Sequence, residues 1–445
     1  MAARIRNREI SSTQLIRAHL EQIERINPKL NAVTEVLAET ALKAAHKADQ
    51  TSPYGPLHGV PFSVKDSIDV AGARSTAGTM GRRNAAAAER DATVVARLRQ
   101  AGAIPIAKTN LPDLLFSFET DNLIFGRTNN PYDPTRTPGG SSGGESALIA
   151  ACGSPLGLGS DCLGSVRVPA AFCGIASIKP TSGRLPRTGH VPPAGSWFEA
   201  LWQIGPMARH VEDLQLAIEL MAYPDEEDFR APPVPLGKTR DLRDLRVAFF
   251  THNGFAQCEQ SVVDAVTKCA RLLEELGMEV EEERPPGLEQ AYELELAILG
   301  ADGAVGIDDY LRAAGSDQIH PLHAAFVDHM RAHRMTTTEF TRRWAQWDEF
   351  RVGIRSFFHR YDVVLCPVYT QTALEHGHSA IESNFQGFSY TMAWNLAGAP
   401  AATVRCSEAM GLPVNAQVVA RPWEDMTALA VCAVIEEQFG GWRPA

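Results

Sequence analysis

Three serines flanked by glycine have the residue type and the surroundings needed for nucleophilic catalysis. Ser141 and Ser142 lie in a Gly-Gly-Ser-Ser-Gly-Gly run, and Ser165 follows Gly164. Glycine beside a serine lets the backbone approach a ligand closely and adopt conformations that a Cβ would forbid. The two sites therefore indicate hydroxyls held on a rigid base, joined by a small-residue segment that we expect to form a buried helix. Two Gly/Ser loops without chemistry are the alternative.

A third element lies upstream, where Lys65 ends an apolar, strand-like run that begins at Val60. The unperturbed pKa of lysine is about 10.4. Lysine therefore acts as a base near neutral pH only where burial lowers that value. The apolar run before Lys65 predicts that the amine is buried away from water. The alternative is a surface ion pair between Lys65 and the neighbouring Asp66.

Together these segments resemble the amidase signature family. The chain contains Gly-Val-Pro-Phe-Ser-Val-Lys-Asp at 59–66, the Gly-Gly-Ser-Ser-Gly-Gly run at 139–144, and the pattern GxDxxGSxR at 159–167. The order, the spacing and the flanking residues all agree with the family. The resemblance covers roughly residues 5–215 and 360–442, and the segment between them is poorly matched.

The resemblance implies a Ser-Ser-Lys catalytic triad. Ser165 corresponds to the nucleophile, Ser141 to the bridging hydroxyl that relays a proton, and Lys65 to the base. In the family the serine corresponding to Ser141 follows a cis peptide bond. Amide hydrolysis needs these groups because the nucleophile must be activated and the leaving amine must receive a proton. Asp161 and Arg167 flank the nucleophile loop and are expected to brace it rather than to touch the substrate.

The backbone N–H groups of Cys162, Leu163, Gly164 and Ser165 are expected to form the oxyanion hole. The family usually has Gly-Gly-Ser where this chain has Leu163-Gly164-Ser165. If position 163 requires a positive φ, leucine costs roughly 1–2 kcal/mol there. Otherwise its side chain simply narrows the site. We favour this second interpretation because the rest of the motif is intact.

Leu115, Phe116 and Phe118, together with Gly140, correspond to residues that bind the acyl group in family members similar to fatty-acid amide hydrolases. They predict an apolar or aromatic acyl group, although phenylalanines in such a run are often part of the core. The tryptophan-rich segment 187–202 is expected to roof the cleft.

These motifs predict an amidohydrolase that cleaves a small or medium amide, anilide or carbamate through an acyl-enzyme. Such an enzyme resembles the family's aryl acylamidases and urethanases. One alternative is an A-type amidotransferase subunit that works with partner subunits. Glutamine-handling members usually carry Gln where this chain has Val168. A non-catalytic relative is the other alternative, and the retention of Lys65, Ser141 and Ser165 argues against it.

Two other kinds of catalytic site are disfavoured by their sequence context. Gly140–Gly144 matches the GxSxG nucleophile elbow of α/β-hydrolases, but an elbow follows an apolar strand. Here the proline-rich segment 130–138 precedes it, which predicts a loop. The histidines show no HExxH or clustered spacing, so we expect neither a metal nor a cofactor.

The composition is that of an ordinary globular enzyme, with 44% hydrophobic and 21% charged residues among 445. The net charge of −11, without a lysine/arginine block longer than a pair, argues against nucleic-acid binding. No apolar run reaches the roughly 18 residues of a membrane span. Eight cysteines without CxxC spacing indicate reduced thiols in a cytoplasmic protein. The first twelve residues lack the apolar core of a signal peptide.

Alternating helical and strand patterns predict an α/β fold with helices on both faces of a sheet, and the resemblance implies that this sheet is large, twisted and mixed. We expect one amidase domain over residues 1–445. Its signature core covers about 55–215, a partly helical variable insertion covers about 220–360, and the chain returns to the core over 360–442. A small-molecule amide is the expected partner, and homodimerisation is left open.

Local patterns predict several individual elements. An amphipathic helix is expected at 11–26, with Ser11 and Gln14 as its capping box. A second helix is expected at 34–49, and Asp91 is expected to cap a third helix that runs to Leu98. Another helix is expected at 338–359, with a heavy aromatic stripe that we interpret as core.

Overall fold

The computed structural model describes residues 1–193, 197–237 and 240–445, and its centre is one eleven-stranded sheet. In spatial order the strands are β1 (Val33–Val36), β3 (Ile104–Thr109), β2 (Pro61–Lys65), β4 (Leu156–Asp161), β6 (Gln203–Ala208), β5 (Ala176–Lys179), β10 (Ala401–Ala409), β11 (Leu412–Ala420), β9 (Val363–Pro367), β7 (Arg246–Phe249) and β8 (Glu279–Glu282). Parallel pairing joins β2 to β3 and β4, and β7 to β8 and β9, while the other neighbours are antiparallel. The sheet is therefore mixed, as the resemblance predicts.

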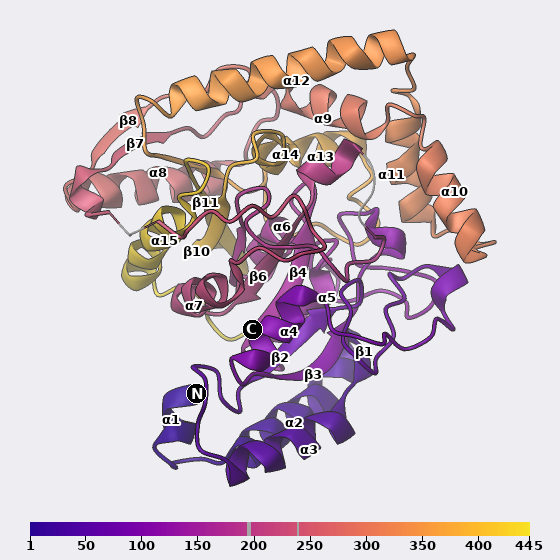
Figure 1. Cartoon of the computed structure of the whole chain (residues 1–445). Helices are drawn as coiled ribbons and strands as arrows, with labels where there is room; N and C mark the ends of the chain where they lie inside the picture. The colour runs from indigo at the N-terminus through magenta and orange to yellow at the C-terminus, as the bar shows by residue number, and fades with distance from the viewer. Residues whose placement is uncertain (194–196, 238–239) are drawn as a thin grey trace.

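Helices surround this sheet along its whole length (Figure 1). They are α1 (Ala2–Arg6), α2 (Ser12–Leu30), α3 (Ala38–Gln50), α4 (Thr93–Gln100), α5 (Gly143–Ala150), α6 (Arg167–Phe172), α7 (Val211–Met221), α8 (Gln260–Glu275), α9 (Ala291–Leu299), α10 (Val305–Ala314), α11 (Pro321–Arg331), α12 (Thr337–Phe357), α13 (Glu382–Gly387), α14 (Ser389–Leu396) and α15 (Asp425–Phe439).

The side chains of β6 show which helices cover each face of the sheet, because successive residues of a strand point to opposite faces. Ile204 and Ala208 share a core cluster with Val211 of α7. Met207 points the other way and packs with Ile149 of α5. Helices therefore cover both faces, and the α/β prediction is confirmed.

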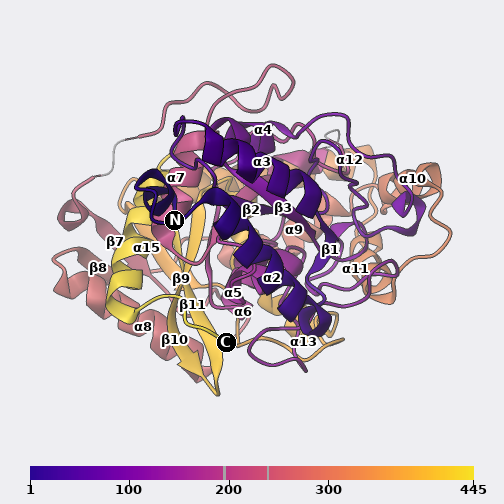
Figure 2. The ribbon, with the colours of Figure 1, turned by 90° about the horizontal axis from the view of Figure 1, so that it is seen from below.

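The N-terminal helix forms as its sequence predicts, although it extends further. Helix α2 begins at Ser12, and Ser11 and Gln14 form the expected capping box. Seen from below, α2 and α3 lie next to each other over the first strands of the sheet (Figure 2).

Two local predictions are wrong, and tertiary contacts explain both. Residues 33–36 form strand β1 rather than the start of a helix, because they pair with the edge of β3. Asp91 does not cap α4, whose N-cap is Ala92. The Asp91 carboxylate instead accepts from the Ala71 backbone at 2.8 Å and pairs with Arg99 at 2.9 Å.

Helices α9 to α12 come from the poorly matched segment and lie beside the core, with α12 running along the top of the molecule in Figure 1. The aromatic stripe of α12 is core, as expected, since Trp347 is fully buried. The Trp347 indole N–H donates to the Leu396 carbonyl at 2.8 Å, which ties α12 to the end of α14.

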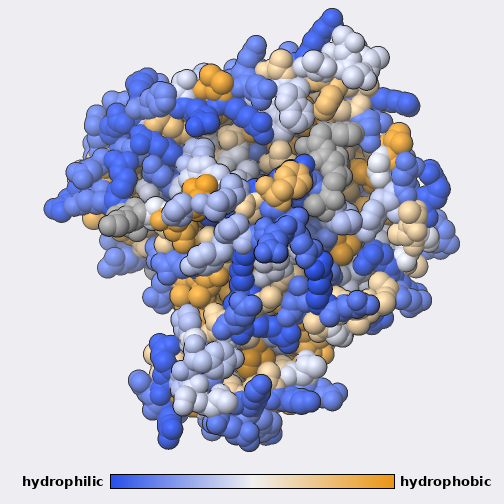
Figure 3. Space-filling model, viewed as in Figure 1, coloured by the Kyte–Doolittle hydropathy of each residue, from blue (hydrophilic) through white to orange (hydrophobic). Residues whose placement is uncertain are grey.

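Polar and charged residues cover most of the face shown in Figure 3, with hydrophobic residues scattered among them. Within the described ranges, no helix is both long enough and apolar enough to cross a membrane. All eight cysteines are free thiols.

Candidate active site

Strand β2 places Lys65 at the centre of the candidate site. All five residues of the strand are buried, and parallel neighbours flank it on both sides. The Lys65 Nζ lies 2.6 Å from the Ser141 Oγ, 3.2 Å from the Ser160 Oγ and 3.4 Å from the Ser160 carbonyl oxygen. Asp66 pairs instead with Lys108, at 3.5 Å. The alternative of a surface pair between Lys65 and Asp66 is therefore wrong.

The environment of Lys65 favours an uncharged amine. Burial lowers the pKa of Lys65 well below its ordinary value, and the negative charges of Asp161 and Glu145 offset only part of that effect. An amine that is neutral near neutral pH has a free lone pair and can accept a proton.

Ser141 and Ser142 lie directly before helix α5. The Gly140–Ser141 peptide bond is cis, and the helix begins at Gly143, directly after Ser142. As the small-residue composition predicts, every residue of α5 is buried.

A buried glutamate in α5 fixes this helix to the strand that ends in Lys65. The Glu145 carboxylate accepts hydrogen bonds from Ser63 of β2 and, at 2.6 Å, from Thr109 of β3. Burial raises the pKa of Glu145 to about 7, against the lowering effect of these hydroxyls and of Lys65. No sequence motif marks Glu145, because the helix around it consists mainly of small and apolar residues.

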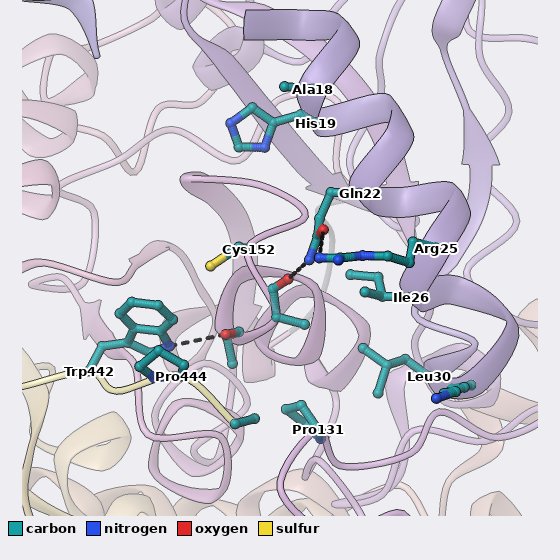
Figure 4. A pocket seen from close by; sticks show the side chains of 14 residues that line it. Ala18, His19, Gln22, Arg25, Ile26, Leu30, Pro131, Cys152, Trp442 and Pro444 are labelled. Atoms are coloured by element: carbon teal, nitrogen blue, oxygen red, sulfur yellow. Dashed lines mark hydrogen bonds between the residues drawn. The ribbon is translucent and has the colours of Figure 1, made fainter.

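Segments from both ends of the chain hold the far end of α5. The Gln22 side chain donates to the Ala151 carbonyl at 2.6 Å, and the Trp442 indole donates to the Ala150 carbonyl at 3.1 Å (Figure 4). These bonds satisfy carbonyls that a helix end leaves without partners. An open cleft lies here, but none of the predicted catalytic residues lines it.

The nucleophile loop is built around the Asp161 carboxylate. Asp161 accepts from the Gly164 N–H at 2.9 Å and the Val166 N–H at 3.1 Å, and forms a fully buried ion pair with Arg167 at 2.9 Å. Burial raises the pKa of Asp161, but Arg167 outweighs this effect and the pKa falls to about 2. Asp161 and Arg167 therefore brace the loop, as expected.

The backbone of the loop shows whether position 163 requires a positive φ. The positive φ belongs to Gly164, at 134°, where a Cβ would lie 2.4 Å from the Thr391 hydroxyl. Leu163 is not among the residues with positive φ. Leu163 instead lines the pocket that contains Ser141 and Ser165. The interpretation that leucine strains the backbone is therefore wrong, and the interpretation that its side chain narrows the pocket is retained.

The four predicted oxyanion donors are not equivalent. Because the Gly164 N–H donates to Asp161, it is not available to an oxyanion in this structure. Within the described chain, the N–H groups of Cys162, Leu163 and Ser165 donate to no acceptor. Unpaired N–H groups in a largely buried loop are the donors that a developing oxyanion needs.

Ser165 lies in the same pocket as Ser141 but is not bonded to it. The Ser165 carbonyl accepts from the Ser142 N–H at 3.1 Å, and the residue is 8% exposed. Among the described residues, the Ser165 hydroxyl has no hydrogen-bond partner, so it is free to turn toward Ser141 or toward a substrate. Lys65 and Ser141 are thus hydrogen-bonded. No hydrogen bond joins the Ser141 and Ser165 hydroxyls in this structure.

The pocket above Ser141 and Ser165 is narrow and has mainly apolar walls. Its lining residues are Leu115, Phe116, Ser117, Phe118, Ser141, Ser160, Cys162, Leu163, Ser165, Trp202, Leu299, Phe326 and Met330. Trp202 comes from the segment expected to roof the cleft, and the side chains of Trp197 and Phe198 lie outside the described residues. Leu299, Phe326 and Met330 come from α9 and α11 and were missed, since that segment matches no motif.

Gly140 lies under the pocket rather than in its lining. A Cβ at Gly140 would be 2.6 Å from the Ser117 carbonyl, so glycine permits close contact between these two segments. The backbone that leads to Phe116 is unusual, because Leu114 and Leu115 have φ values of 47° and 68°. Left-handed backbone at a non-glycine residue costs about 1–3 kcal/mol and clusters at functional sites.

The sequence profile of the family described as Amidase matches residues 14–429. The chain belongs to the amidase signature family. The family places this amidase among hydrolases that act on carbon–nitrogen bonds other than peptide bonds. In the described ranges, no three His, Cys, Asp or Glu side chains are gathered as metal ligands would be.

Known relatives of this amidase include both hydrolases and amidotransferase subunits. It is 31% identical to fatty-acid amide hydrolase 2 of Homo sapiens over 99% of this chain and 88% of that protein. It is 30% identical to the A-type subunit of the glutamyl-tRNA(Gln) amidotransferase of Heliobacterium modesticaldum over 97% and 94%, respectively. The structure of 6-aminohexanoate cyclic dimer hydrolase with its substrate matches with a TM-score of 0.89 and 26% identity, over 100% of this chain and 97% of that one.

Proposed function

We propose that this amidase cleaves a small or medium amide, anilide or carbamate through an acyl-enzyme on Ser165, with Lys65 as the base and Ser141 as the proton relay. The observation that carries the proposal is the 2.6 Å contact between the buried Lys65 amine and Ser141, beneath a pocket that also holds Ser165.

In the first half-reaction, neutral Lys65 takes the proton of Ser141 while Ser141 takes the proton of Ser165. The Ser165 oxygen then forms a bond to the substrate carbonyl carbon, and the carbonyl π electrons move to its oxygen. The N–H groups of Cys162, Leu163 and Ser165 stabilise that oxyanion. When the C–N bond breaks, the proton held by Lys65 returns through Ser141 to the leaving amine.

The second half-reaction uses the same relay. A water molecule gives a proton through Ser141 to Lys65 and attacks the acyl-Ser165 ester. Collapse of this second tetrahedral intermediate releases the acid, and Ser165 recovers its proton from the relay. A carbamate enters the same scheme because its carbonyl carbon is the same electrophile.

The pocket walls support an apolar or aromatic acyl group. Phe116, Phe118 and Phe326 contribute ring surface, and Leu163 lies next to the oxyanion donors. Burial of a ligand's apolar surface against such walls contributes about 25 cal/mol per Å². Gly140 supports the pocket wall indirectly, because the absence of a side chain lets the segment at Ser117 pack against the cis peptide.

An amidotransferase A-type subunit is the second candidate, since such subunits are among the relatives. Val168, in place of the glutamine typical of glutamine-handling members, counts against it. The net charge of −11 also disfavours a large anionic partner. The hydrogen bond between Lys65 and Ser141 argues against a non-catalytic role. A cytoplasmic location and homodimerisation remain predictions.

The purified chain alone, assayed on matched amides, anilides, esters and carbamates, tests the proposal. We expect turnover without any partner subunit, fastest for apolar or aromatic acyl groups. Activity that appears only after a partner subunit is added would favour the amidotransferase assignment.

A further inference from the structure

His190 is a buried polar side chain next to the catalytic lysine that the reaction scheme does not use. It is 3% exposed. Its Nδ1 lies 3.3 Å from the Pro192 carbonyl oxygen. Its Nε2 lies 3.1 Å from the Ser160 Oγ and 3.3 Å from the Ser67 Oγ.

These contacts fix which ring nitrogen carries the proton. A carbonyl oxygen can only accept, so Nδ1 carries the hydrogen and donates it to Pro192. Burial, followed by the positive charge of Arg187, lowers the pKa of His190 well below its ordinary value, so the ring is neutral. In a neutral imidazole the other nitrogen is an acceptor. Two hydroxyls face Nε2, that of Ser160 at 3.1 Å and that of Ser67 at 3.3 Å, and we assign the lone pair of Nε2 to the nearer Ser160 hydroxyl.

The direction of that hydrogen bond determines what Ser160 can offer to Lys65. Once its single hydrogen points to His190, the Ser160 hydroxyl can only accept from the Lys65 amine, 3.2 Å away. A neutral amine has two N–H groups and one lone pair. The Ser160 Oγ and the Ser160 carbonyl, at 3.4 Å, take the two N–H groups. The lone pair is left to face Ser141.

We propose that His190 is a positioning residue: by accepting the Ser160 hydrogen, it holds the Lys65 amine with its lone pair toward Ser141. This inference rests on the roles proposed for Lys65 and Ser141. Without the acceptor at His190, the Ser160 hydroxyl turns and donates to Lys65, competing with Ser141 for the lone pair.

A role for His190 in packing alone predicts a different order of activity among His190 variants, so the packing role and the positioning role can be distinguished. The His190 ring also packs edge-on against Trp202, with centroids 4.9 Å apart. His190→Phe keeps a ring but has no acceptor. His190→Gln loses the ring but can bring its amide oxygen to the place of Nε2. If packing of the ring matters most, His190→Phe should retain more activity than His190→Gln. If the hydrogen-bond acceptor matters most, His190→Gln should retain more.

The rate of labelling by a fluorescent alkyl fluorophosphonate measures activation of the nucleophile without a known substrate. We expect His190→Phe to be labelled about tenfold more slowly, the scale of one lost hydrogen bond, and His190→Gln to stay within about threefold of the unaltered protein. On an active 4-nitroanilide the loss should appear in kcat, with KM nearly unchanged. His190→Asn, whose amide reaches only Pro192, should behave like the Phe variant and serves if that variant does not fold.

Labelling of His190→Phe at the unaltered rate, or slower labelling of the Gln variant than of the Phe variant, would overturn the inference. In a Ser160→Ala background, His190→Phe should cause no further loss, and an undiminished loss there would also overturn it. A failure of the unaltered protein to be labelled would overturn the proposed function itself, and the role of His190 with it.

Discussion

Lys65 lies at the end of a fully buried strand, and its chemistry follows from this burial. Burial lowers its pKa, so the deprotonated form that can act as a base is present well below the ordinary pKa of an amine. The same burial lowers the free energy of unfolding, because the Lys65 amine binds a proton in the unfolded chain and loses it when the chain folds.

The pH dependence of stability provides one prediction. The folded-state pKa of Lys65 is below its unfolded value, so the folded state becomes less stable as the pH falls from the unfolded pKa to the folded one. Lys65→Met removes that cost. We expect the variant to be inactive yet to melt at a higher temperature than the unaltered protein. The difference should grow from alkaline to neutral pH, and a constant difference would mean that the amine is charged in the fold.

Ser165→Ala should abolish both turnover and fluorophosphonate labelling, because the labelled oxygen is then absent. Ser142 is the natural control, since it lies in the Gly-rich run but is fully buried with its hydroxyl 3.3 Å from the Ser160 carbonyl. Ser142→Ala should still be labelled. Labelling of the Ser165 variant but not of the Ser142 variant would move the nucleophile to Ser142.

In the proposed mechanism, the loop between β4 and α6 provides both the nucleophile and a wall that selects substrates. Its shape depends on Gly164 and on the Asp161 carboxylate, so Leu163 is free to act as a pocket wall. A contact of the size of one methylene discriminates substrates by about 1–3 kcal/mol.

Leu163→Gly should therefore broaden the accepted substrates while leaving the smallest amide nearly unaffected. The values of kcat/KM for a small and a bulky amide, measured with the melting temperature, check this. A uniform gain in rate together with a higher melting temperature would contradict the selectivity role.

Elements fixed by local sequence were predictable, and those fixed by distant contacts were not. Lys65 and α5 follow from short motifs whose residues are neighbours in the chain. The edge strand β1 exists only because β3 pairs with it. The pocket residue Phe326 and the positioning residue His190 act across the fold, and no local pattern of residues marks such positions.

Gln22 and Trp442, which are more than 400 residues apart in the sequence, both bond to the end of one short helix, α5. The indole of Trp442 bonds to the end of α5, and the Arg209 guanidinium lies 5.3 Å from the centre of its ring. The catalytic arrangement at the start of α5 therefore depends on segments that are distant in sequence.

Trp442→Ala should lower the free energy of unfolding by about 1–3 kcal/mol, since it removes a partly buried aromatic contact and a hydrogen bond. Trp442→Phe keeps most of the apolar contact and should lose less. Urea denaturation of the three proteins measures both values. Equal stability of all three would show that α5 does not need this support.

The position of β10 and β11 also has a consequence for synthesis on the ribosome. These two strands are the last to be translated, yet they lie in the middle of the sheet, between β5 and β9. Until residues 401–420 emerge, the nascent chain has an unpaired edge at β5, and the strands β7 to β9 have no partner that joins them to it. Exposed strand edges of this kind promote aggregation of partly folded chains. We therefore expect partly synthesised chains that lack residues 401–420 to aggregate more readily than chains that contain them.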